Sequence, residues 1–351
     1  MKKKLSKSAG IKEIAEVLGV SIGTVDRALH SRPGINPETR ARVLKMAEKL
    51  NYRPNVAARA LKLNRNLRLA VHLPEQIASF FDPLREGIRA AAASTLGFKV
   101  ELDFRIYPRL GEGEIDLLKK DLEREYDGLI LTAGNPQRID PLLRQLAARN
   151  VPVICVASDA PHSPRLASVS VDAFISGGIA AELLAMTCTH DGSVAVVTGN
   201  LSTLDHAEKL RGFAAALAVM APHLQLLAAV ESHEKAEEAY LETTALLNRH
   251  SRINGIYVNT ANSLPVLRAL EEQGLLGRVQ VITTDLFPEL VPLIESGSVL
   301  ATLHQRPFTQ GKIAFETLLR YIVDHSKPTL ITKLAPHVVL RSNLPLFSKQ
   351  M

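Results

Sequence analysis

From Leu67 onward, short apolar runs alternate with segments of helical periodicity, and this alternation restricts the possible folds more than any other feature. The apolar runs predict strands at 69–73, 100–106, 128–132, 151–156, 193–198, 226–230, 255–258 and 279–283. Helical patterns lie at 83–96, 112–126, 139–149, 173–190, 207–220, 235–249 and 262–273. Such alternation is typical of parallel sheets covered by crossover helices, so we expect a body of two doubly wound α/β lobes.

Residues 11–29 predict a helix, a tight turn and a second helix, the pattern of a helix-turn-helix head. Gly19 can adopt a positive φ at the turn, and Ser21 can cap the second helix. The apolar residues at helical spacing predict one buried face on each helix: Ile11, Ile14, Ala15 and Leu18 on the first, Val25, Ala28 and Leu29 on the second. Asn36 and Pro37 are typical of a helix start, so we expect a third helix from Pro37 to about Leu50.

In a helix-turn-helix domain the second helix lies in the DNA major groove. The candidate DNA-binding residues on it are Ser21, Ile22, Gly23, Thr24, Arg27 and His30. Arg27 is the best candidate for a base contact, because a guanidinium can bond guanine O6 and N7 together. The same pattern also occurs in ordinary helix packing, and a single arginine is commonly a solvated surface charge.

The charge distribution favours DNA binding over ordinary packing. Residues 1–66 carry 15 Lys and Arg against 5 Asp and Glu, whereas the remainder of the chain has a net charge of −4. A basic head on an acidic body is the electrostatic pattern of a protein that binds a polyanion.

The motifs that follow point to one family. Gly19-Val20-Ser21, Thr24-Val25, Arg27-Ala28-Leu29 and Asn51-Tyr52-Arg53-Pro54-Asn55 occur in this order, followed by Ala58 and Leu61. Together they resemble the head of LacI/GalR-family transcription regulators. The resemblance implies that residues 54–66 include a hinge helix, capped by Asn55, with Ala58 packed near Leu61 and Leu61 wedged into the minor groove of operator DNA. An inserted apolar side chain of this kind kinks the duplex. Gly23 lies where family members usually place a base-reading side chain.

Ligands of doubly wound sheets lie beyond the carboxyl ends of the strands. Polar or aromatic residues follow several predicted strands: Phe80, Phe81, Ser158, Asp159, Asn259, Asp285 and Gln305. The body is similar to type I periplasmic sugar-binding proteins, the effector domain of LacI/GalR regulators. The resemblance implies that Asn259, Asp285 and Gln305 bind the hydroxyls of a polyol and that Phe81 stacks on a sugar ring.

Two departures from the family pattern affect the effector. Family members often carry Asp-Arg after the fourth strand and an arginine before a Gly-Phe pair in the second lobe. Here the first position reads Ala157-Ser158-Asp159, and His206 and Lys209 precede Gly212-Phe213. We expect Asp159, His206 and Lys209 to take the missing roles. A positive His206/Lys209 pair would admit a phosphate or an acid sugar; alternatively, both residues belong to a plain helix surface.

Other features exclude several classes. No run approaches the roughly 18 apolar residues that span a bilayer, and Met1-Lys2-Lys3-Lys4 is followed by Leu-Ser-Lys-Ser rather than by the apolar core of a signal peptide. We therefore expect a cytoplasmic protein that does not contact membranes. Cys155 and Cys188 stand without a second thiol or a histidine at metal-ligand spacing, so neither a disulfide nor a metal site is predicted.

The sequence therefore predicts a small all-α helix-turn-helix head (1–53), a hinge helix and linker (54–66), and a two-lobed α/β effector-binding and dimerisation body (67–351). Lobe 1 is predicted at 67–160 and 297–325, and lobe 2 at 161–296 and 326–345. We expect a homodimeric repressor that binds operator DNA under the control of a sugar-like effector, without a cofactor.

Two other classes remain to be compared with this prediction. A sugar-binding or sugar-modifying α/β enzyme with an accessory DNA-binding head is the main alternative, but the sequence has no Gly-x-Gly-x-x-Gly, no Gly-Lys-Ser/Thr loop and no Gly-x-Ser-x-Gly elbow. A secreted transport receptor does not explain the head.

Overall fold

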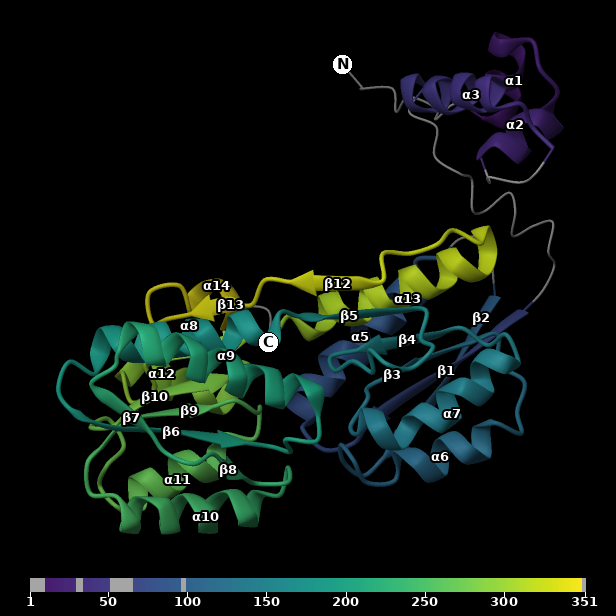
Figure 1. The fold of residues 1–351 in the computed structure, drawn as a ribbon. Coiled ribbons are helices and arrows are strands. Elements are labelled where there is room, and N and C mark those ends of the chain that lie inside the picture. The colour runs from purple at the N-terminus through teal and green to yellow at the C-terminus, as the bar shows by residue number, and fades with distance from the viewer. Residues whose placement is uncertain (1–9, 30–33, 51–65, 96–98, 349–351) are drawn as a thin grey trace. The chain divides into compact units, whose positions relative to one another are not determined.

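A computed structural model describes residues 10–29, 34–50, 66–95 and 99–348. The chain divides into two compact units: one combines Met1–Leu67 with Ser94–Val100 and Leu319–Pro328, and the other holds the remaining residues. Figure 1 shows the helical head and the α/β body. Four predicted DNA-binding residues lie outside the described residues: His30, Asn55, Ala58 and Leu61.

The head contains α1 (Ile11–Leu18), α2 (Ile22–Leu29) and α3 (Pro37–Lys49), as predicted. Gly19 ends α1 with φ of 64°, a left-handed conformation that glycine adopts without steric cost. Asn36 begins α3, and its side-chain oxygen accepts a hydrogen bond of 2.8 Å from the Glu38 N–H. The helices are held by a shared apolar core consisting of Ile14, Ala15, Val25, Ala28, Val43 and Ala47.

The first lobe is built on a sheet with the strand order β12-β5-β4-β3-β1-β2. Its strands are β1 (Asn66–Pro74), β2 (Lys99–Tyr107), β3 (Gly128–Leu131), β4 (Val153–Val156), β5 (Ala167–Val171) and β12 (Ile331–Leu334). The pairs from β1 through β3, β4 and β5 to β12 are parallel. Helices α6 (Glu114–Asp121) and α7 (Pro136–Ala148) cover one face of this sheet, while α5 (Ala78–Ala93) and α13 (Pro307–Asp324) cover the other (Figure 1).

The second lobe is built on a sheet with the order β13-β11-β10-β9-β6-β7, with β8 paired to β6. Its strands are β6 (Gly192–Thr198), β7 (Leu224–Leu226), β8 (Val230–Glu231), β9 (Ile253–Val258), β10 (Gln280–Thr284), β11 (Ala301–His304) and β13 (His337–Val339). Only β13 pairs antiparallel among the registered pairs of this sheet in the described chain.

Each face of the second sheet is covered by helices. The helices α8 (Ala173–Thr187) and α9 (Leu204–Met220) pack on one face. On the other face lie α10 (Ala236–Arg249), α11 (Leu264–Glu272) and α12 (Val291–Ser296), the last preceded by the 3-10 turn η1 (Pro288–Leu290). A short helix, α14 (Pro345–Ser348), follows β13. Two doubly wound lobes were predicted, and two are present.

The predicted lobe boundaries do not coincide with the division of the strands between the two sheets. The residues of β5 and β12 fall in the range predicted for lobe 2 but pair in the first sheet, and those of β11 fall in the range predicted for lobe 1 but pair in the second; none of the three was among the predicted strands. The physical reason is that strand pairing is a long-range property: the Ala-Ser-Val-Ser-Val of β5 carries a weak apolar signal, yet it lies between β4 and β12. The single strand predicted at 226–230 is two short strands, β7 and β8.

The helix α5 begins at Ala78 rather than at residue 83. Pro83 is typical of a first helical turn, but the buried side chains of Phe80 and Phe81 extend the helix toward its N-terminus. These two phenylalanines therefore lie on a helix and not in the loop where we expected them.

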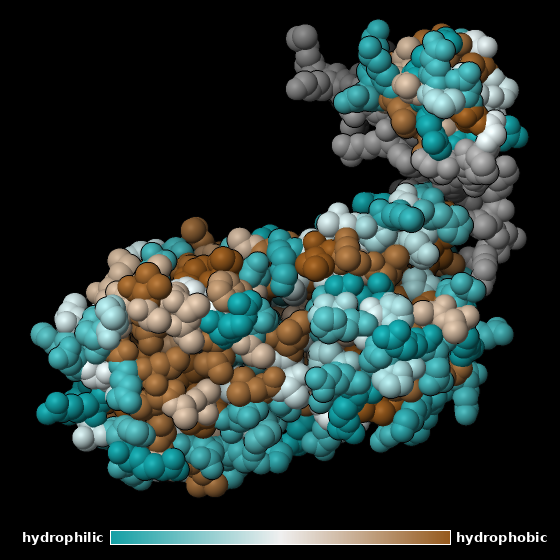
Figure 2. All heavy atoms as spheres, viewed as in Figure 1, coloured by the Kyte–Doolittle hydropathy of each residue, from teal (hydrophilic) through white to brown (hydrophobic). Residues whose placement is uncertain are grey.

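Glycines let two helix pairs pack closely. A Cβ on Gly311 of α13 would lie 2.1 Å from the Leu84 carbonyl oxygen of α5, and one on Gly177 of α8 would lie 1.9 Å from the Lys209 carbonyl oxygen of α9. Figure 2 shows hydrophobic residues gathered over α8 and α9, where Met186 and Val219 are exposed. None of the described helices combines the length and the apolarity that a membrane span requires.

Candidate functional site

The head presents the predicted recognition surface on α2. Ser21, Ile22, Gly23 and Arg27 are exposed, whereas Thr24 is half-buried. Ser21 caps α2, because its hydroxyl accepts a hydrogen bond of 3.0 Å from the Thr24 N–H. Buried Val25 and Ala28 fix the opposite face of the helix against α1 and α3. The exposed face of α2 is therefore free to meet a groove of DNA.

The body contains a cavity at the carboxyl ends of strands from both lobes. Its empty volume, including its open mouth, is about 410 Å³. The lining residues are Ile77, Phe80, Phe81, Leu110, Thr132, Ala157, Ser158, Thr203, Asp205, His206, Lys209, Glu234, Thr260, Ala261 and Gln305. A mixed apolar and polar lining is typical of a small-molecule site. Six of the nine predicted effector residues line it: Phe80, Phe81, Ser158, His206, Lys209 and Gln305.

Strained backbone is concentrated around this cavity. Three lining residues other than glycine adopt positive φ: Ile77 at 61°, Ala157 at 66° and Glu234 at 58°. Asp285, which is hydrogen-bonded to Gln305, and Arg306, which follows Gln305 in the sequence, also adopt positive φ, at 65° and 59°. The left-handed conformation costs a non-glycine residue about 1–2 kcal/mol, and such costs are typical of functional sites.

Lys209 is completely buried in the wall formed by lobe 2, with its side chain 1% exposed. Its Nζ lies 2.6 Å from Asp205 Oδ2 and donates hydrogen bonds of 2.8 Å to Gln305 Oε1 and 3.3 Å to the backbone carbonyl oxygen of Asn259. Lys209 is therefore a structural centre of the cleft, which excludes the alternative of a plain helix surface.

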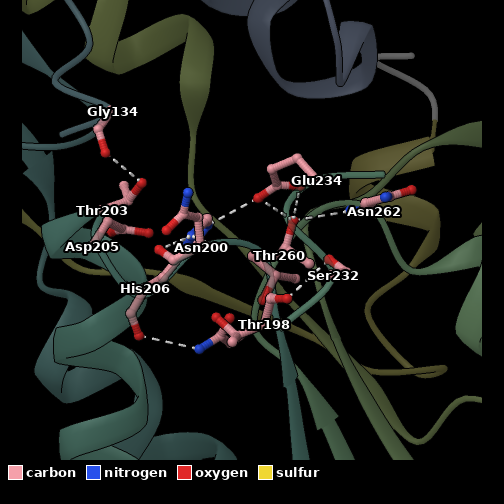
Figure 3. A network of polar contacts seen from close by, with 12 residues as sticks. Gly134, Thr198, Asn200, Thr203, Asp205, His206, Ser232, Glu234, Thr260 and Asn262 are labelled. Atoms are coloured by element: carbon pink, nitrogen blue, oxygen red, sulfur yellow. Dashed lines mark hydrogen bonds and ion pairs between the residues drawn. The ribbon is translucent and has the colours of Figure 1, made fainter. Parts of the chain in front are cut away.

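His206 and Glu234 form a second buried pair in the same wall (Figure 3). His206 Nε2 lies 3.3 Å from Glu234 Oε1, and the Thr260 hydroxyl lies 2.8 Å from Glu234 Oε2. The Asn200 backbone N–H donates to His206 Nδ1 at 3.1 Å. Nδ1 also lies 3.2 Å from the Asn200 carbonyl oxygen, so both ring nitrogens of His206 have polar partners within the protein.

Lobe 1 supplies an aromatic and hydroxyl wall. The rings of Phe80 and Phe81 meet edge to face with centroids 4.9 Å apart. Thr132 Oγ1 and Ser158 Oγ are buried without a hydrogen-bond partner among the described residues. Both hydroxyls line the cavity, so both can bond a ligand.

Three predicted effector residues do not line the cavity. Asp285 accepts hydrogen bonds from Gln305 at both carboxylate oxygens, at 2.8 Å from the backbone N–H and at 2.6 Å from Nε2. Asn259 donates to the His206 carbonyl oxygen at 3.2 Å, and its own carbonyl oxygen accepts from Lys209. Asp159 is paired with Arg165. Asp285 and Asn259 thus orient lining side chains.

A hydrogen bond joins the two lobes at the edge of the cavity. The Thr203 hydroxyl of lobe 2 donates to the Gly134 carbonyl oxygen of lobe 1 at 2.8 Å (Figure 3). Gly134 and Asn135 in turn donate their N–H groups to the buried Glu114 carboxylate. Burial raises the pKa of Glu114 above its ordinary value, although the backbone hydrogen bonds oppose that rise.

Several lining residues were not predicted: Ile77, Leu110, Thr132, Ala157, Thr203, Asp205, Glu234, Thr260 and Ala261. Asp205 had a detectable signal, because it precedes Lys209 by one helical turn. Glu234 had none, since its inward direction depends on positive φ at His233 and Glu234.

Two family models match the sequence. The model described as bacterial regulatory proteins, lacI family, matches residues 10–55, and the model described as a periplasmic binding protein domain matches residues 69–326. The chain is 25% identical over 337 residues to Catabolite control protein A of Priestia megaterium, covering 95% of this chain and 98% of the relative. It is 24% identical over 341 residues to the HTH-type transcriptional repressor PurR of Vibrio parahaemolyticus, covering 96% and 98%.

Solved structures resemble the body. The glucose-galactose binding protein GanP from Geobacillus stearothermophilus matches with a TM-score of 0.73 and 25% identity, covering 80% of this chain and 99% of that protein. A solute-binding protein from Agrobacterium vitis bound with α-D-tagatopyranose matches with a TM-score of 0.74, covering 81% and 98%. Its 18% identity shows a shared fold alone.

Proposed function

This chain belongs to the LacI family of bacterial regulatory proteins, DNA-binding transcription regulators with an effector-binding domain, and we propose that it is a repressor controlled by a small sugar-like effector. The observation that carries the proposal is the cavity in the body, which combines aromatic faces with buried polar groups that have free bonding capacity. Polyols need both, because their hydroxyls bond polar groups and their C–H faces pack on rings.

The effector would act by favouring one arrangement of the lobes. Lining residues come from both lobes, so a ligand that contacts both walls stabilises the arrangement in which the walls are closest. If operator affinity differs between the two arrangements, the ligand changes it by the same factor by which DNA changes ligand affinity. This reciprocity distinguishes a regulator from a protein that simply carries two binding sites.

The proposal includes a homodimer in the cytoplasm. The head offers one recognition helix, and a helix-turn-helix protein reads a pseudo-palindromic operator with two heads related by two-fold symmetry. Sedimentation of the full chain is expected to give twice the 38.3 kDa of one chain. A stable monomer that binds its operator with full affinity would contradict the dimer.

Operator recognition is tested with duplexes selected from a random pool. Arg27→Ala removes the exposed guanidinium of α2 and is expected to weaken binding to the selected duplex by about 5- to 150-fold, the range of one bidentate base contact. Lys45→Ala removes a positive charge from the exposed face of α3 and serves as the matched control, with a uniform and smaller loss. Equal affinity of the protein for random and selected duplexes would contradict sequence-specific regulation.

A further inference from the structure

The positive charge of Lys209 is fully used within the protein. An ammonium group has three donors, and Lys209 Nζ has three partners within 3.3 Å: Asp205 Oδ2, Gln305 Oε1 and the Asn259 carbonyl oxygen. Its side chain is 1% exposed, so no donor points to a ligand. Lys209 therefore cannot serve as a binding group for phosphate or carboxylate without losing these bonds.

The second candidate cation, His206, also has its partners within the protein. His206 Nε2 lies 3.3 Å from Glu234 Oε1, and Nδ1 lies 3.1 Å from the Asn200 backbone nitrogen and 3.2 Å from the Asn200 carbonyl oxygen, so both ring nitrogens are occupied within the protein. Among the described residues, the side chains that line the cavity include no arginine. The arginines near its lobe 1 wall are paired, Arg85 with Asp82 and Arg165 with Asp159.

The carboxylates in the cavity keep bonding capacity, whereas its cationic side chains do not. The lining carries the carboxylates of Asp205 and Glu234; Lys209 is paired with the first, and His206 lies against the second. Glu234 is 1% exposed; the Thr260 hydroxyl lies 3.0 Å and 2.8 Å from its two oxygens, and His206 Nε2 lies 3.3 Å from Oε1. A carboxylate has about four acceptor positions, so Glu234 keeps capacity for donors of a ligand. Asp205 Oδ1 is likewise buried without a partner among the described residues.

From the unpaired carboxylate acceptors and the paired cations we infer that the cleft selects a ligand without negative charge, a neutral or amine-bearing polyhydroxylated molecule, and rejects sugar phosphates and sugar acids. The ligand donates hydroxyl or ammonium protons to Glu234 and Asp205 in lobe 2. Its oxygens accept from Thr132 and Ser158 in lobe 1. An anionic group at the same place would face a buried carboxylate with no free cation in the lining. The inference rests on the proposed function, because it names the ligand class of the same cleft.

Matched sugars test the charge preference on the full chain. We propose thermal shift and calorimetric titration with D-glucose, D-glucosamine, D-glucose 6-phosphate and D-glucuronate, and with the corresponding galactose series, since the ring stereochemistry is open. Within the series that binds, the neutral or amine-bearing members are expected to bind at least ten times more tightly than the anionic members. Tighter binding of the phosphate or the uronate would overturn the inference and leave the regulator intact. If no member of either series binds, both the sugar-like effector and the inference fail.

Two variants assign the preference to a residue. Glu234→Gln keeps the size of the side chain and removes its charge, so it is expected to reduce the difference in affinity between neutral and anionic members at least threefold. Glu237→Gln makes the same chemical change three residues away on the exposed start of α10, outside the cavity lining, and is expected to leave the difference unchanged. Equal discrimination by the two variants would refute the assignment to Glu234.

Discussion

Replacement of Lys209 by methionine gives the sharpest test of the buried polar wall. Lys209→Met keeps the apolar stem but removes the ammonium group, which leaves Asp205 Oδ2, Gln305 Oε1 and the Asn259 carbonyl oxygen without a donor. Breaking a buried ion pair by removing one partner costs about 3–5 kcal/mol. The Asp205 side chain is 11% exposed, so water relieves part of the stranded charge and the lower end of the range, about 3 kcal/mol, is expected.

The assay is thermal unfolding of the full chain, monitored on the transition of the body. For a domain of this size a loss of 1 kcal/mol lowers the melting temperature by roughly 2–4 °C, so Lys209→Met is expected to lower it by about 6–12 °C. The double variant Asp205→Asn/Lys209→Met removes the stranded carboxylate and is expected to recover at least half of that loss. A decrease below about 2 °C, or a double variant no more stable than the single one, would refute the account of Lys209 as a neutralised, structural cation.

Three further predictions concern stability. Gly311→Ala places a Cβ against the Leu84 carbonyl oxygen and is expected to destabilise the body by about 1–3 kcal/mol, whereas Gly178→Ala, whose Cβ meets nothing closer than 3.9 Å, is expected to be neutral or stabilising in urea unfolding. His233→Gly places glycine at a φ of 48°, where relief of about 1–2 kcal/mol of strain exceeds the entropy cost of glycine, about 0.5–1 kcal/mol, so a gain of up to about 1 kcal/mol in urea unfolding is expected and a loss would contradict this. Burial raises the pKa of the Asp121 carboxyl, but the hydrogen bonds and charges of His72 and Arg105 outweigh burial and hold this pKa below its ordinary value. The stability lost in Asp121→Asn is therefore expected to be full above the ordinary aspartate pKa and to vanish as the pH falls through the lowered pKa, and a constant difference across acid urea titrations would contradict this.

The sequence predicted the elements that have strong local patterns. The head was predictable because Gly19, Ser21 and Asn36 occupy turn and cap positions that few other residues fill. The strands of the body were predictable because their apolar runs are short and regularly separated. The sheet to which β5, β11 and β12 belong was not predictable, because it depends on pairing between segments that are distant along the chain.

The candidate site shows the same division. Residues directly after strands were found, including Ser158 and Gln305, because the carboxyl ends of parallel strands meet at one edge of a sheet. Which of these residues line the cavity and which only position lining side chains was not predictable. Asp285 and Asn259 act through Gln305 and Lys209, and Glu234 reaches the cavity through a backbone conformation that side-chain patterns do not encode.

The inter-lobe hydrogen bond adds a physical link between the two halves of the cavity. Thr203 begins α9, the helix that also carries Asp205, His206 and Lys209, and its hydroxyl reaches the Gly134 carbonyl oxygen of lobe 1. A change in the separation of the lobes would therefore alter this bond as well as the contacts between the lining residues. The N-terminal half of α9 is the element through which a bound ligand would affect both lobes.

The central claim, that a ligand in the body controls the head, is tested most directly by operator affinity at increasing ligand concentration. The measurement uses the selected duplex and whichever matched sugar stabilises the protein, with the full chain and its Gln305→Ala variant. The two proteins are expected to bind DNA equally without ligand, and saturating sugar is expected to change the operator Kd of the wild type at least tenfold while leaving that of Gln305→Ala unchanged. A sugar that binds the wild-type cleft and leaves its operator Kd unchanged would contradict the account.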